Sequence, residues 1–195
     1  MGKIILCRGK KADTPLTVLQ TGVKLYTAEE LCYYIYNNIY LIGQDFIDDN
    51  LISFLDETGE KELAERVRKL KETGGSLAQI FVIILKTIDY YSVEEIEQLK
   101  GILNTLGKQS VCARLKARGD GYLNAGYYFA AVRCYESIIK DYKGKDLLAA
   151  DYAKVYHNLG TAYARMFMYD KAVIYYDEAY RTCLLYTSPS PRDCS

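Results

Sequence analysis

The chain has 195 residues, of which 50% are hydrophobic and 26% charged, and its 25 basic residues balance its 25 acidic ones. This composition excludes a disordered or collagen-like chain, because enough apolar side chains are present to bury a continuous core. A net charge of zero gives no general electrostatic attraction to nucleic acid or to an anionic membrane, so neither is an expected partner.

The first 26 residues have a sequence pattern that is typical of short β-strands. Apolar runs at residues 4–7, 16–19 and 23–26 are separated by glycine and proline residues, which interrupt regular structure. We therefore expect a small β-hairpin near the N-terminus.

Helical spacing begins at Thr27. Thr27 with Glu30, and later Ser92 with Glu95, form capping boxes, which mark the starts of helices. The first helix is predicted to run for about 15 residues. Further amphipathic segments follow at residues 46–55, 63–70, 77–88 and 92–103, and Gly107 marks a boundary. Residues 1–108 are thus predicted to form a mainly helical domain of no recognised type.

Two copies of one pattern follow, with Gly119 and Gly160 at equivalent places. The first copy comprises Leu115, Gly119, Tyr122, Tyr128, Ala131, Tyr135 and Ile138, and the second Tyr156, Leu159, Gly160, Tyr163, Tyr169, Ala172, Tyr176 and Ala179. Glycine and alanine at these positions let two helices approach closely, while the aromatic side chains between them interlock. The pattern predicts paired helices.

This pattern resembles the tetratricopeptide repeat family over about residues 110–182. The resemblance implies two helix-turn-helix repeats in residues 109–182 and an all-α protein of the α-solenoid kind. The spacing from Gly119 to Gly160 exceeds the family period of about 34 residues, so an insertion of seven residues is expected in the linker around Lys143. The first copy departs from the pattern at Arg118, where leucine is usual, and at Lys143, where the closing proline is usual.

The resemblance also implies a function as a scaffold or adaptor. In such repeats the first helix lines a groove that binds a peptide or helix of another protein. The groove side chains would be Lys116, Asp120, Leu123, Asn124, Lys154, His157, Asn158, Thr161 and Arg165. In chaperone-binding members, lysine and asparagine side chains grip a terminal carboxylate, which Asp120 would repel here. A merely solvated helix face is the alternative for Lys116, His157 and Arg165.

Binding of RNA by the helical repeats is the alternative function, because arginine, lysine and tyrosine can hold phosphates and bases. No enzyme, cofactor or metal is expected. His157 is the only histidine, the cysteines form no CxxC pair, and no glycine-rich phosphate loop is present. Without a secretory signal or an apolar run near the roughly 20 residues of a membrane span, a cytoplasmic protein with reduced cysteines is expected.

Residues 183–195 do not look like part of the fold. Reverse translation of Cys183 to Asp193 closely resembles a transposase adapter used in DNA library preparation. We therefore expect this tail to be translated adapter, the gene to be interrupted near Thr182, and the sequence to come from an assembled metagenomic-type sequencing read. A natural, disordered tail rich in serine and proline is the alternative.

Overall fold

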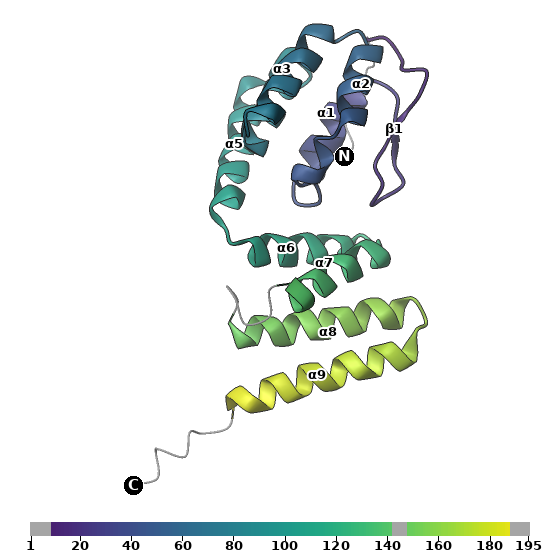
Figure 1. Ribbon diagram of the computed structural model, residues 1–195, viewed down its shortest axis with the longest axis vertical. Helices are drawn as coiled ribbons and strands as arrows, with labels where there is room; N and C mark the ends of the chain where they lie inside the picture. Colours follow the sequence, from purple (N-terminus) through teal and green to yellow (C-terminus); the bar gives the residue numbers. More distant parts are fainter. Residues whose placement is uncertain (1–8, 142–147, 188–195) are drawn as a thin grey trace. The chain divides into compact units, whose positions relative to one another are not determined.

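A computed structural model describes residues 9–141 and 148–187 of the chain (Figure 1). These residues form nine α-helices, one short 3-10 helix and a two-stranded hairpin, so the fold is all-α as the sequence predicts. The chain divides into two compact units, Met1–Lys108 and Gln109–Ser195, which we call the N-terminal and the C-terminal unit.

The N-terminal unit opens with the predicted hairpin. Strands β1 (Leu16–Thr17) and β2 (Lys24–Leu25) pair antiparallel, with Leu16 opposite Leu25. Gly22 takes a positive φ of 70° in the turn, a conformation that glycine adopts without steric cost. The strand expected at residues 4–7 lies outside the described residues.

Helix α1 (Ala28–Asn37) begins at the predicted capping box of Thr27 and Glu30. It has ten residues, so the expectation of about 15 was wrong. The backbone N–H and the side-chain amide of Asn38 both donate to the carbonyl of Tyr34, each at 3.0 Å. An asparagine that satisfies the backbone locally in this way competes with further helix, and α1 ends there.

The other helices of this unit follow the predicted segments. They are α2 (Asp49–Glu57), which comes after the 3-10 helix η1 (Gln44–Phe46), then α3 (Lys61–Glu72), α4 (Leu77–Ile88) and α5 (Val93–Lys108). Gly107, expected at a boundary, is the penultimate residue of α5. Helix α2 packs on α3, α4 packs on α5, and α1 packs on α4. Their shared core includes Leu31, Ile35, Leu55 and Phe81.

The C-terminal unit consists of two helix pairs. Helices α6 (Val111–Asn124) and α7 (Tyr128–Asp141) form the first pair, and α8 (Ala149–Arg165) and α9 (Tyr169–Thr187) the second. Helix α7 also packs on α8, which stacks the pairs one after the other (Figure 1). The linker insertion around Lys143 and the last eight residues, 188–195, lie outside the described residues. Helix α9 includes residues 183–187 of the tail that we expected to be translated adapter.

Candidate protein-binding surface

Asp120, a predicted groove residue, connects three helices of the C-terminal unit. Its Oδ2 accepts a charged hydrogen bond from Lys116 Nζ at 2.8 Å. Its Oδ1 accepts from the hydroxyl of Tyr135 on α7 at 2.7 Å and from Nδ2 of Asn158 on α8 at 2.9 Å. The structure thus brings together three predicted groove residues, Lys116, Asp120 and Asn158, in a partly buried network that connects the helices.

Tyr135 lies at the centre of this network. Its ring packs so closely on Gly119 that a β-carbon there would lie 2.7 Å from Cε1 of the ring. Burial, with the hydrogen bond to Asp120 and the charge of that carboxylate adding to it, raises the pKa of Tyr135 well above its ordinary value. The phenol therefore stays protonated and donates to Asp120.

The second helix pair repeats this arrangement at the equivalent positions of the pattern. A β-carbon at Gly160 would lie 2.9 Å from Cδ1 of Tyr176, and the Tyr176 hydroxyl lies 3.1 Å from Oγ1 of Thr161. The ring of His157 lies beside Tyr176, with the two centroids 5.3 Å apart. In the first pair the hydroxyl also approaches Asn158 of the following helix, at 3.4 Å. Within the described residues, Tyr176 meets no counterpart of Asn158.

The other predicted groove residues are mostly exposed. Asn124, Lys154, His157 and Arg165 are exposed to solvent, whereas Leu123 is half-buried. Lys154 lies 3.5 Å from the carboxylate of Asp151 on its own helix. These side chains are spread over α6 and α8 and do not form a compact charged site.

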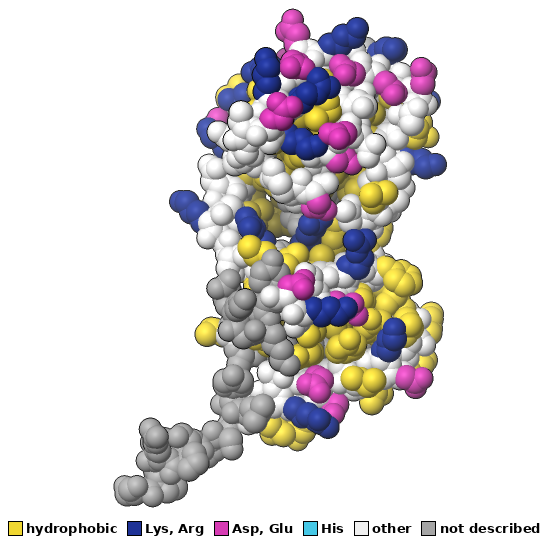
Figure 2. Space-filling view, in the orientation of Figure 1, with side chains coloured by type: hydrophobic (Ala, Val, Ile, Leu, Met, Phe, Trp, Pro, Cys, Tyr) yellow, Lys and Arg dark blue, Asp and Glu magenta, His cyan; other side chains and the backbone are white. Residues whose placement is uncertain are grey.

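An apolar stripe runs along the outer side of α9. It consists of Tyr169, Val173, Tyr176 and Tyr180, all of them exposed and spaced three or four residues apart, and we call it the α9 stripe. Its counterpart on α7, at the equivalent positions of the first pair, is more deeply buried: Tyr128 and Ile139 are half-buried, and Val132 and Tyr135 are buried in a helix that packs on α8. Val132 is 8% exposed where Val173 is 66% exposed, and Tyr135 is 0% exposed where Tyr176 is 36% exposed. Hydrophobic side chains also gather on the visible face of the C-terminal unit in Figure 2.

The turn before α9 adds another exposed aromatic group. Phe167 is 78% exposed and has a φ of 62°, which is rare for a bulky residue. At the equivalent place between α6 and α7 stands Gly126, with a φ of 82°. The second turn thus keeps the backbone conformation of the first but presents a phenylalanine to solvent.

Sequence reasoning did not identify the α9 stripe. It placed Ala172, Tyr176 and Ala179 together as structural positions, and the two alanines are indeed buried. The signal that could have separated them is the apolar spacing at residues 169, 173, 176 and 180, which lies on a different side of α9 from the alanines.

In the described part of the chain, no helix combines the length and the apolar character needed to cross a membrane. No group of three or more histidine, cysteine, aspartate or glutamate side chains there could hold a metal ion.

Comparison of the chain with protein-family models, with curated proteins and with solved structures found no match.

Proposed function

We propose that this protein is a protein-interaction module, a scaffold or adaptor with tetratricopeptide-like repeats that binds a helix of a partner protein. One observation carries the proposal. The α9 stripe is exposed, whereas the equivalent positions on α7, which packs on α8, are buried or half-buried. Because contiguous exposed apolar side chains are unfavourable in water, such a stripe is typical of a surface that packs against a further helix.

The contacts between α8 and α7 indicate which side chains the partner helix should carry. Helix α8 presents an amide, Asn158, to the Tyr135 hydroxyl, and a phenol, Tyr163, which donates to Glu136 of α7 at 2.8 Å. A partner helix of the same kind would place apolar and small side chains on the α9 stripe. It would also supply a polar group to the hydroxyl of Tyr176.

The predicted groove adjoins this surface. His157 and Thr161 of α8 both contact Tyr176, so the exposed side of α8 continues into the α9 stripe. Phe167 stands at the start of α9, in a backbone conformation that costs free energy for a bulky residue. An exposed aromatic side chain kept at such a position supports a binding role.

A peptide with the sequence of α8, residues 149–165, tests the proposal directly. Labelled with fluorescein, it is expected to bind the full chain, measured by fluorescence anisotropy. Val173→Glu and Tyr180→Glu place a charge in the α9 stripe, so each should weaken binding at least about ten-fold. Ala125→Glu adds the same charge at an exposed position at the end of α6 and should leave the affinity unchanged.

Two results would contradict the proposal. One is equal affinity of the peptide for the wild type and for both stripe variants. The other is the absence of peptide binding together with tight, strongly salt-dependent binding of an oligouridylate, which would favour the RNA-binding alternative.

A further inference from the structure

Helix α4 of the N-terminal unit carries large apolar side chains on its outer face as well as on its buried face. One side, with Ile80, Phe81 and Ile84, is fully buried in the core of the unit. On the other side, Val82 and Ile83 are only half-buried. The outer face also carries exposed polar side chains, so its two large apolar residues are only partly covered by the chain.

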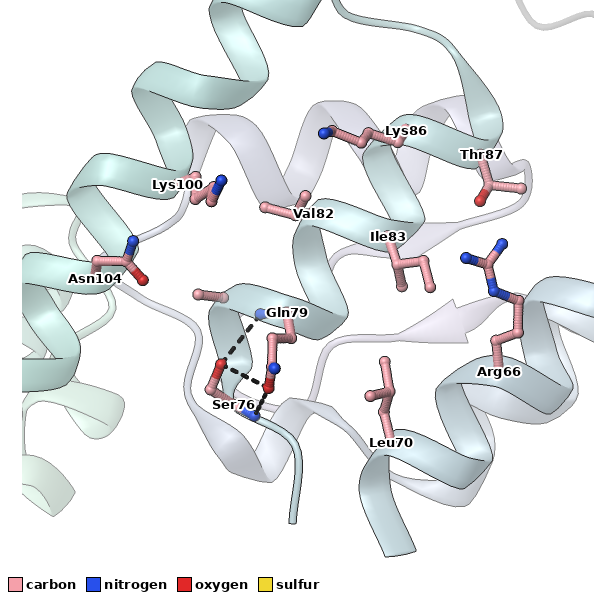
Figure 3. A pocket seen from close by; sticks show the side chains of 11 residues that line it. Arg66, Leu70, Ser76, Gln79, Val82, Ile83, Lys86, Thr87, Lys100 and Asn104 are labelled. Carbon is pink, nitrogen blue, oxygen red and sulfur yellow. Dashed lines mark hydrogen bonds between the residues drawn. The ribbon is translucent and has the colours of Figure 1, made fainter. Parts of the chain in front are cut away.

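A cleft of about 800 Å³ lies over this outer face, with α3 on one side and α5 on the other (Figure 3). Its floor is formed by Val82 and Ile83 of α4 with Leu70 of α3. The lining extends along α4 from Ser76 to Thr87, a length of roughly 17 Å at 1.5 Å per residue. The cleft is thus about as long as three turns of a helix.

The rim of the cleft is positively charged. Arg66 on α3, Lys86 on α4 and Lys100 on α5 line it, and no aspartate or glutamate is among its described lining residues. Glu97 lies just outside the lining, 3.5 Å from Lys86 and 3.0 Å from Lys100. The Lys100 hydrogen bond, with smaller contributions from the charges of both lysines, lowers the pKa of Glu97. Three cations against one carboxylate leave an excess of positive charge.

At the end of the cleft where α4 begins, the polar groups already have hydrogen-bond partners within the chain. The backbone N–H of Ser76 donates to Oε1 of Gln79 at 2.8 Å, and the N–H of Gln79 donates to Oγ of Ser76 at 3.2 Å. Figure 3 shows both bonds at the start of α4. A ligand of the cleft therefore meets mainly an apolar floor and cationic edges.

We propose that this cleft binds an amphipathic helix of a partner protein, with the apolar side of that helix on the floor and its acidic residues at the rim. The length of about three turns fits a helix in a groove, the mode in which apolar residues spaced three and four apart fill such a cleft. A concave site lined from three helices does not fit a flat membrane surface. The site shares no helix with the α9 stripe, so it goes beyond the function proposed above.

The probe is a fluorescein-labelled helical peptide about four turns long, with leucines spaced three and four apart and glutamates on both flanks. A second peptide carries lysines in place of the glutamates. With the full chain, we expect the acidic peptide to bind at least about ten-fold more tightly than the basic one. Arg66→Glu should abolish this preference, because it changes the rim from three cations against one carboxylate to two against two. Lys69→Glu makes the same charge change on α3 outside the lining and should have no effect.

Several outcomes would overturn the proposal. These are equal affinity for the two peptides, no binding of the acidic peptide at millimolar concentration, or an equal loss with Lys69→Glu and Arg66→Glu. Flotation with phosphatidylserine vesicles that is lost in Arg66→Glu, without peptide binding, would assign the cleft to a lipid surface instead. Circular dichroism of both variants checks that each remains folded.

Discussion

The two helix pairs of the C-terminal unit have the same local design and different surroundings. In each, a glycine of the first helix lies against a tyrosine ring of the second, at 2.7 Å for Gly119 and 2.9 Å for Gly160, measured from an added β-carbon. In the first pair the tyrosine is fully buried, and in the second it is 36% exposed. The difference comes from the following helix, because α8 covers α7 and no described helix covers the α9 stripe.

Some contacts form within a helix pair, and others need the helix that follows the pair. The glycine and tyrosine contact forms within a pair and is present in both. The burial of Val132 and Tyr135 and the second partner of the Tyr135 hydroxyl involve the next helix, and the second pair shows neither at its equivalent positions within the described residues. The same pattern position is therefore core in the first pair and exposed surface in the second.

The largest expected difference between the pairs concerns the two tyrosines. Tyr135→Ala removes a fully buried ring and should lower the free energy of unfolding by about 3–5 kcal/mol. Tyr176→Ala removes a ring that is already partly in water and should cost about 1–2 kcal/mol. Urea unfolding of the full chain, followed by circular dichroism, measures both. Equal losses would show that the α9 stripe is buried in solution.

The polar network should distinguish the pairs next. Asp120→Ala leaves the Tyr135 hydroxyl and the Asn158 amide without their shared acceptor in a partly buried place, at a cost of about 2–3 kcal/mol. Thr161→Ala removes the equivalent contact of Tyr176, where water can replace it, and should cost under about 0.5 kcal/mol. The same urea experiment measures both variants. If both cost the same, the network does not hold the helices together.

The sequence predicted most of the fold because its signals are local. The capping boxes at Thr27 and Ser92 mark helix starts correctly, and the segment 77–88 is α4 to the residue. The length of α1 was missed because it is set by Asn38, whose side chain bonds to the carbonyl four residues earlier and ends the helix.

The candidate site was less predictable, since exposure depends on neighbouring helices and not on local pattern. The family pattern put Asp120 and Asn158 in a groove, while the structure places them in contact with Tyr135. Likewise, Tyr135 and Tyr176 occupy the same pattern position and differ in burial. The cleft over α4 forms only when α3 and α5 are in place. The apolar sequence of residues 77–88 by itself therefore predicted a buried helix and no cleft.

High pH provides a test of the buried phenols. Burial raises the pKa of Tyr135 and of Tyr163, so the folded state favours their protonated forms. Their contribution to stability is complete below about pH 10, the ordinary tyrosine pKa, and is lost as the pH rises above it. The free energy of unfolding should then fall by up to about 1.4 kcal/mol per pH unit for each such tyrosine.

Tyr135→Phe removes one of these groups. Between pH 10 and pH 11.5 its free energy of unfolding should decline less steeply than that of the wild type. The difference in slope should be up to about 1.4 kcal/mol per pH unit. Urea titrations at several pH values measure the two slopes. Identical slopes would mean that Tyr135 ionises in the folded protein as readily as in the unfolded chain.

The smallest expected effect concerns the turns before α7 and α9. Gly126 and Phe167 have similar positive φ values, 82° and 62°, and only glycine adopts this conformation without strain. Phe167→Gly should therefore raise the free energy of unfolding by about 0.5–1 kcal/mol, measured by urea unfolding. A loss of stability in this variant would mean that the exposed ring contributes packing that outweighs the strain.

The same variant links stability to binding. If Phe167 contacts the bound peptide together with the α9 stripe, Phe167→Gly should weaken binding of the α8 peptide while making the protein more stable. Gly126→Ala supplies the matched control, because it introduces strain at the covered pair and leaves the stripe unchanged; it should lower stability without altering peptide affinity. Opposite signs for stability and binding at Phe167 would identify this residue as one retained for contact with a partner, since glycine at the same turn of the first pair already provides the more stable solution.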